Sequence, residues 1–180
     1  MKYKICLIFL LLCLVVSNSA CDKKSGRESQ VEDRTATASQ TDSQNSETLP
    51  LNVQLTNQAW EAFENDDHER AIGYAQRCIN EFFGGAERKQ LQLEKENAAL
   101  PPTGSVSEQE RNAISELGLL NDVATCLFIK GRCEEALEHK EEAIKAYQAA
   151  SKYTYARCWD PKGWFWSPSE AALDRLSVLK

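Results

Sequence analysis

Apolar side chains recur along most of this chain at intervals of three and four residues, beginning near Leu51. That spacing places them on one face of a helix, whereas the strict alternation typical of half-buried strands does not occur. The sequence therefore predicts an all-α domain over residues 51–180. A domain of this size is large enough to form one hydrophobic core.

Two stretches, at about 55–83 and 123–155, each have the pattern of two amphipathic helices joined by a short polar turn. In the first, Asp66 and Glu69 lie three residues apart beside the turn, which predicts a capping box at the start of its second helix. Small residues recur in both stretches. We expect them to let the paired helix backbones approach closely, because the distance between packed helices depends on the side chains at the contact.

The second stretch resembles a tetratricopeptide repeat, in which the pattern W-x2-L-G-x2-Y precedes A-x3-F and a closing P. Its matching positions hold Leu127 for Trp, Gly131 for Gly, Ala143 for Ala and Tyr147 for the aromatic residue. The departures from the pattern are Lys130, Glu134 and Tyr155. The resemblance implies a stack of antiparallel helical hairpins that presents a binding surface to a protein or peptide partner.

The first stretch matches the same pattern with alanine at four positions, namely Ala59, Ala62, Ala71 and Ala75. Ala71 and Ala143 are 72 residues apart, close to twice the repeat length of roughly 34. We therefore expect a degenerate third hairpin between the two stretches, at 86–120, with Gly84 and Gly85 ending the helix before it.

Helix-start signals mark the remaining helices. Ser107 and Glu110 form the pattern of a capping box, after which either a helix breaks near Gly118 or one long helix runs from Glu108 into Leu137. Near the C-terminus, Ser167-Pro168-Ser169-Glu170 combines an N-cap serine, a proline at the first helical position and a glutamate at the third. This predicts a capping helix over 168–179, with Leu173, Leu176 and Leu179 on or near its inner face.

The N-terminal residues predict export. Lys2 and Lys4 precede an apolar run too short to span a membrane, so residues 1–20 are interpreted as a signal peptide. Cys21 follows the small residues that end the signal, which resembles a bacterial lipobox and implies lipidation of that cysteine. Cleavage without lipidation is the alternative and implies a secreted or soluble periplasmic protein. Residues 21–50 are polar and lack aromatic residues, and are expected to form a disordered tether.

The charge balance argues against a nucleic-acid partner. The chain has a formal net charge of −6, which becomes −8 once Lys2 and Lys4 leave with the signal peptide. Binding to phosphates needs a basic surface, and no predicted helix carries a basic stripe. The predicted location is the bacterial cell envelope, facing the periplasm; Asp22 after the lipid-modified cysteine resembles an inner-membrane retention signal, and the choice of membrane stays open.

Three of the four tryptophans, Trp159, Trp164 and Trp166, lie in a segment expected to be a loop. Such rings either contact a ligand or seat the final helix against the core. Of the cysteines downstream of the tether, Cys133 and Cys158 are the preferred disulfide pair, among three pairings for four cysteines. The alternative is that Cys78, Cys126, Cys133 and Cys158 are all buried thiols.

No catalytic motif and no metal-ligand spacing occurs, so neither an enzymatic activity nor a metal or cofactor is predicted. The leading hypothesis is an adaptor or scaffold, anchored to the membrane by a lipid, that binds a protein or peptide. The alternative is a carbohydrate-binding or carbohydrate-processing envelope protein that uses the segment 159–166. A structural subunit without its own ligand is a third hypothesis.

Overall fold

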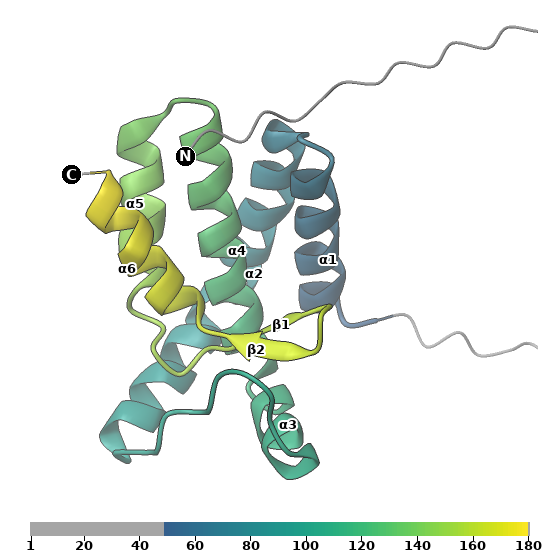
Figure 1. Ribbon diagram of the computed structural model, residues 1–180, viewed down its shortest axis with the longest axis vertical. Helices are drawn as coiled ribbons and strands as arrows, with labels where there is room; N and C mark the ends of the chain where they lie inside the picture. The colour runs from purple at the N-terminus through teal and green to yellow at the C-terminus, as the bar shows by residue number, and fades with distance from the viewer. Residues whose placement is uncertain (1–48, 180) are drawn as a thin grey trace, which may run out of the picture. The chain divides into compact units, whose positions relative to one another are not determined.

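A computed structural model describes residues 49–179, and this part of the chain is mostly helical (Figure 1). The helices are α1 (Leu51–Glu64), α2 (His68–Lys95), α3 (Glu108–Ser115), α4 (Gly118–Ala136), α5 (Lys140–Ala150) and α6 (Pro168–Val178). One antiparallel pair of strands, β1 (Cys158–Asp160) and β2 (Trp164–Trp166), lies between α5 and α6. The predicted signal peptide, Cys21 and the tether as far as residue 48 lie outside the described residues. The helical class is confirmed, with the strand pair as an addition that the sequence did not predict.

Five of the helices lie side by side and alternate in direction along the chain, in the order α1, α2, α4, α5 and α6 (Figure 1). Helices α1 and α2 form one hairpin, and α4 and α5 form another. Helix α4 is the centre of this arrangement, because it contacts α1, α2, α5 and α6. Most of its residues from Leu120 to Gly131 are accordingly buried.

Both hairpins turn in the same way. Asp66 and Glu138 adopt positive φ angles of 57° and 62°, which let the chain leave α1 and α4 through a left-handed residue. The next amide then bonds back into the helix, from Asp67 N to Ala62 O at 2.9 Å and from His139 N to Glu134 O at 2.8 Å. The expected capping box at Asp66 is wrong: Asp66 is this left-handed residue, and the side chain of Asp67 caps α2 instead by accepting from the Arg70 amide.

Burial repeats with the same 72-residue spacing. The paired positions Ala59 and Gly131, Ala71 and Ala143, and Ala75 and Tyr147 are buried in both hairpins, as is Leu127 on α4 and Ala62 on α1. Each hairpin therefore turns the same face toward the core. This agrees with the small residues that the sequence placed at the helix contacts.

A close helix contact joins Gly131 of α4 to Tyr147 of α5. The Tyr147 ring lies directly over the glycine, so that a Cβ built on Gly131 would be 2.6 Å from Cδ1 and Cε1 of the ring. Tyr147 is fully buried, and its hydroxyl donates to a carboxylate oxygen of Glu135 at 2.8 Å. Gly131 thus faces the Tyr147 ring.

The degenerate hairpin expected at 86–120 does not form. Helix α2 continues through Gly84 and Gly85 as far as Lys95, since Gly85 lies against the Leu119 side chain and Ala86 and Gln90 are buried. A loop then leads to α3, which starts at the predicted Ser107 capping box. Of the two alternatives for the next segment, the structure shows the break: α3 ends at Ser115 and α4 begins at Gly118.

Helix α6 covers the α4–α5 hairpin. Ser167 caps it by accepting from the Glu170 amide, and Pro168 occupies the first turn, as predicted. Leu176 and Leu179 pack against the core, but Leu173 is 54% exposed, so its expected place on the inner face is wrong. Arg175 of α6 forms an ion pair with Glu135 of α4, which also accepts the Tyr147 hydroxyl.

We predict that Gly131→Ala lowers the free energy of unfolding by about 1–3 kcal/mol, because the added methyl group would overlap the buried Tyr147 ring. Gly73→Ala is the matched control, since Gly73 lies within α2 with nothing within 4 Å of the added Cβ. That change should stabilise the protein by about 0.5–1 kcal/mol, because alanine favours a helix interior over glycine. Urea denaturation measures both variants, and equal shifts of the two midpoints would refute the close contact.

Candidate binding groove

The tryptophan-rich segment forms a β-hairpin instead of the expected loop. Cys158 pairs with Trp166, Trp159 with Phe165, and Asp160 with Trp164. The turn between the strands is closed by Asp160, whose backbone oxygen accepts from the Gly163 amide at 2.9 Å. Because paired residues share a face of the sheet, Trp159 and Phe165 lie on one side and Trp166 on the other. Trp159 and Phe165 meet edge to face, with ring centroids 4.9 Å apart.

A distant part of the chain holds this hairpin in place. Gly104 exchanges two backbone hydrogen bonds with Phe165, of 2.7 Å and 2.9 Å. Arg157, which directly precedes β1, is buried and donates from its guanidinium group to the carbonyl oxygens of Pro101, Thr154 and Ala156. The loop between α2 and α3 is therefore fastened to the hairpin.

A groove of about 730 Å³ lies between α1, the start of α4 and the hairpin. Its volume is within the range of typical ligand sites. Helix α1 contributes Val53, Thr56, Asn57, Trp60, Glu61 and Glu64; the α3–α4 region contributes Ile114, Ser115, Gly118, Asn121, Asp122 and Thr125; and the hairpin region contributes Arg157, Cys158, Trp159, Asp160, Pro161, Phe165 and Trp166.

Aromatic rings form one wall of the groove and connect it to the core. The Trp166 ring contacts the Trp60 ring at 6.3 Å and the Phe128 ring at 5.2 Å, both edge to face. Of the three tryptophans proposed from the sequence, Trp159 and Trp166 line the groove, whereas Trp164 does not. Trp60 lines it as well, although the sequence gave no reason to place it there.

Asp122 on α4 is a partly buried carboxylate in the wall of the groove. Asn52 of α1 donates a hydrogen bond to it, and burial raises the pKa of Asp122 above its ordinary value of 3.8 despite the hydrogen bonds from Asn52 and Thr56. Sequence reasoning missed this residue because its spacing resembles that of the solvated carboxylates on other helices.

The charge of the groove is predominantly negative. Its carboxylates are Glu61, Glu64, Asp122 and Asp160, and Arg157 is its cationic side chain. None of these four carboxylates forms an ion pair with another residue of 49–179. The groove therefore combines aromatic surface with carboxylates that have no cationic partner in this part of the chain.

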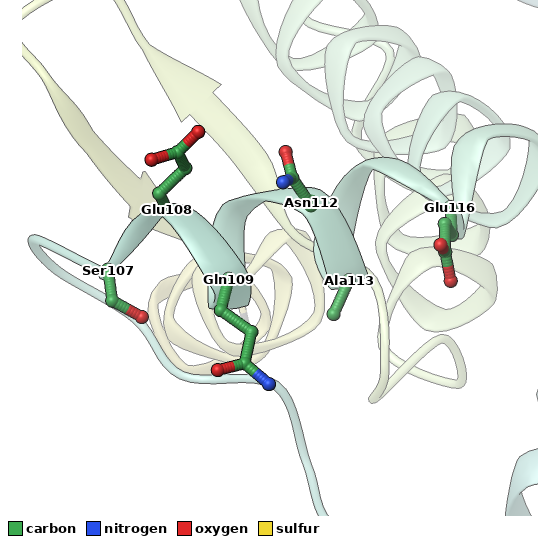
Figure 2. Close-up of a pocket in the computed structure, with 6 residues that line it drawn as sticks. All are labelled: Ser107, Glu108, Gln109, Asn112, Ala113 and Glu116. Atoms are coloured by element: carbon green, nitrogen blue, oxygen red, sulfur yellow. The ribbon is translucent and has the colours of Figure 1, made fainter.

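A second depression, of about 690 Å³, follows the outer surface of α3 (Figure 2). Its lining consists of Ser107, Glu108, Gln109, Asn112, Ala113 and Glu116. All six side chains are exposed and come from one helix and its cap. Because no second element encloses this surface and no buried polar group faces it, the groove beside α1 is the better candidate site.

The four cysteines of the described region are free thiols. The structure does not bring the preferred pair together. Cys158 lines the groove together with Thr125 of α4, and Cys133 lies eight residues further along that helix than Thr125, which is roughly 12 Å at 1.5 Å per residue. A disulfide needs much closer Cα atoms. Burial raises the pKa of both thiols to about 11.

The other two cysteines lie close together in the interface between α1, α2 and α4. Thr56 Oγ1 is 3.8 Å from Cys78 Sγ and 3.4 Å from Cys126 Sγ, so one hydroxyl group lies within hydrogen-bonding distance of both thiols. Both side chains are fully buried. They act as small packing residues beneath the floor of the groove, next to Thr56.

Within residues 49–179, no set of three His, Cys, Asp or Glu side chains is arranged to hold a metal ion. In the same region, no helix is both long enough and apolar enough to cross a bilayer. Comparison of the chain with protein-family models, with curated proteins and with solved structures gives no match in any of the three.

We predict that Asp122→Asn stabilises the protein at neutral pH. A carboxyl whose pKa is raised by folding contributes stability below its unfolded pKa and loses it as the pH rises through the folded value. Asparagine lacks this titration and still accepts the hydrogen bond from Asn52. The difference between the unfolding midpoints of the variant and the wild type should therefore grow above about pH 4 and vanish below it. A midpoint difference independent of pH would show that burial of the charge is not its cause.

Proposed function

We propose that this chain is an envelope-anchored, tetratricopeptide-like scaffold that binds a protein or peptide partner in the groove between α1, α4 and the hairpin. The groove carries this proposal, because it is concave, is lined by aromatic rings from two separate elements and contains carboxylates that form no ion pair within residues 49–179. Sites of this composition bind ligands more often than flat polar surfaces do.

The repeat-like part of the proposal rests on the two similar hairpins. They share the left-handed turn residue, the buried alanines at Ala71 and Ala143, and a 72-residue spacing. Helix α6 then covers the exposed side of the second hairpin, as a terminal cap does in repeat proteins. This architecture suits a scaffold, because stacked hairpins provide extended surfaces for partners.

The envelope location rests on the N-terminal sequence. The signal-like run, Cys21 and the polar segment that follows support export, lipidation and a flexible tether. A tether of roughly 28 residues has a root-mean-square reach near 30 Å, which would let the domain search the nearby membrane surface for its partner. Two or more acyl chains are enough for stable anchoring.

A carbohydrate-binding function is the second candidate, and a specific observation favours it. Trp159 is 39% exposed at the edge of the groove, beside the carboxylates of Asp122 and Asp160. The Arg111 guanidinium lies over one face of this indole, which leaves only its other face to a ligand. An indole face in a lining that also holds carboxylate acceptors suits a sugar ring, whose C–H face stacks on the ring and whose hydroxyl groups donate hydrogen bonds. Calorimetry with envelope glycans distinguishes the candidates, since only this one requires glycan binding that Trp159→Ala abolishes.

We predict that crosslinking and affinity capture from detergent-solubilised envelope recover a specific partner with the wild-type chain, and that Asn57→Arg reduces its recovery about tenfold, an effect of roughly 1.4 kcal/mol. Asn57 is exposed and lines the groove, so a long charged side chain there obstructs it. Gln58→Arg is the control, because Gln58 is the neighbour of Asn57 on α1 and is also exposed but does not line the groove. Cys21→Ala should release the protein from the membrane fraction.

Two results would contradict this function. Equal loss of the partner in the Asn57→Arg and Gln58→Arg variants would show that the groove is not the binding surface. An unchanged membrane fraction for Cys21→Ala would show that the cysteine is not the anchor.

A further inference from the structure

We infer that the groove binds an extended segment of a partner protein through a Lys or Arg side chain, whose cationic group lies between the aromatic wall and Asp122. This inference rests on the proposed function and adds the chemistry of the partner. It follows from three features of the groove: its charge, its aromatic surface and the position of the partly buried carboxylate.

The charge of the lining favours a cation. Glu61, Glu64, Asp122 and Asp160 outnumber Arg157, which leaves three excess negative charges in the lining. The chain as a whole is also acidic, so its field attracts basic segments during encounter. An acidic segment would instead meet carboxylates with no ion-pair partner within the described residues.

Arg157 is not available to a ligand as a donor. Its guanidinium N–H groups donate hydrogen bonds to the carbonyl oxygens of Pro101, Thr154 and Ala156, with lengths of 2.9, 3.0 and 2.6 Å. Turning this side chain toward an anion would break its hydrogen bonds to these carbonyls and would free the loop before α3. The groove therefore offers hydrogen-bond acceptors to a ligand, whereas the Arg157 guanidinium is occupied by hydrogen bonds within the protein.

The aromatic wall suits the rest of a basic side chain. The methylene stem of a lysine or arginine packs on aromatic surface while its charged group reaches a polar site. Two arginines of the protein already place their guanidinium groups over aromatic rings. The guanidinium carbon of Arg111 lies 4.3 Å from the Trp159 ring centroid, and that of Arg132 lies 5.5 Å from the Phe63 and 6.0 Å from the Phe128 ring centroid. Trp60 and Trp166 provide similar surface inside the groove.

Asp122 gives the site its specificity. This carboxylate on α4 is held by a second helix, because the Asn52 side chain of α1 donates a hydrogen bond to it. A bound cation would offset the cost of burying this charge, since opposite charges at close range favour the ionised form. Glu61 and Glu64 are exposed on α1 and act at longer range, mainly on the rate of encounter.

The size of the groove favours a peptide segment over a free amine. A volume of about 730 Å³, open along one side, accommodates several residues of an extended chain. A single small amine would occupy the carboxylate end and leave the wall of Trp60 and Trp166 uncovered. We therefore commit to a peptide segment, and treat a polyamine as an outcome of the test.

In the experiment, peptides that bind are selected from a random library, using the full-length mature chain and its Asp122→Asn and Glu61→Gln variants. Glu81→Gln is the control, because Glu81 is exposed on α2 and does not line the groove. We expect peptides enriched on the wild type and on Glu81→Gln to be rich in Lys and Arg. An enriched peptide should bind about tenfold more weakly when its lysine is replaced by norleucine, and about tenfold more weakly to Asp122→Asn.

Each other outcome overturns the inference in a distinguishable way. Enrichment of neutral or acidic peptides that Asn57→Arg blocks would leave the scaffold function in place but refute the cationic contact. Binding of spermidine without binding of any peptide would assign the groove to a small amine. Binding of glycans alone would favour the carbohydrate function, and no enrichment at all would refute both this inference and the groove as the scaffold's binding site.

Discussion

Close approach of helix backbones across small side chains is the constraint on which the rest of this structure depends. Gly131 leaves room for the Tyr147 ring, and Ala71 and Ala143 occupy the equivalent positions of their hairpins without bulk. These contacts draw α1, α2 and α5 against α4, which makes α4 a buried central helix. Neighbouring helices cover the other sides of α4. The first turns of α4 therefore contribute polar groups such as Asp122 to the side that remains open, which lines the groove. The groove is thus a consequence of how tightly the hairpins pack.

The second requirement is that the β-hairpin stays fixed opposite α1. Two different sets of contacts hold the hairpin in place. The Trp166 ring packs against the rings of Trp60 and Phe128. Hydrogen bonds of Gly104 and Arg157 attach the hairpin to the loop before α3. The aromatic contacts bury apolar surface, whereas the directional hydrogen bonds fix the orientation of the hairpin. Contacts of both kinds restrain the groove wall before a ligand arrives, which lowers the free energy that binding must spend on ordering it.

The sequence predicted those features that local chemistry determines. The caps at Ser107 and Ser167, the two hairpins and the small residues at their contacts are all visible within a few residues of the chain. The failures occurred where distant segments decide the outcome. Helix α2 passes through Gly84 and Gly85 because Leu119 packs there, and residues 158–166 form strands because Gly104 pairs with Phe165. Trp60 and Asp122 meet in one groove through the packing of α1 on α4, which no local pattern records.

The carboxylates at the two ends of α4 have different surroundings, and the difference supports the proposed binding site. At the C-terminal end, Glu134 is buried, yet the hydrogen bonds from Lys130 and His139 together outweigh the effect of burial and lower its pKa. At the N-terminal end, Asp122 has no cationic partner within residues 49–179, and burial raises its pKa. A carboxylate that serves only the fold gains stability from an internal cation, as Glu134 does. Asp122 faces an open groove without one, which is the arrangement expected of a group whose partner comes from another molecule.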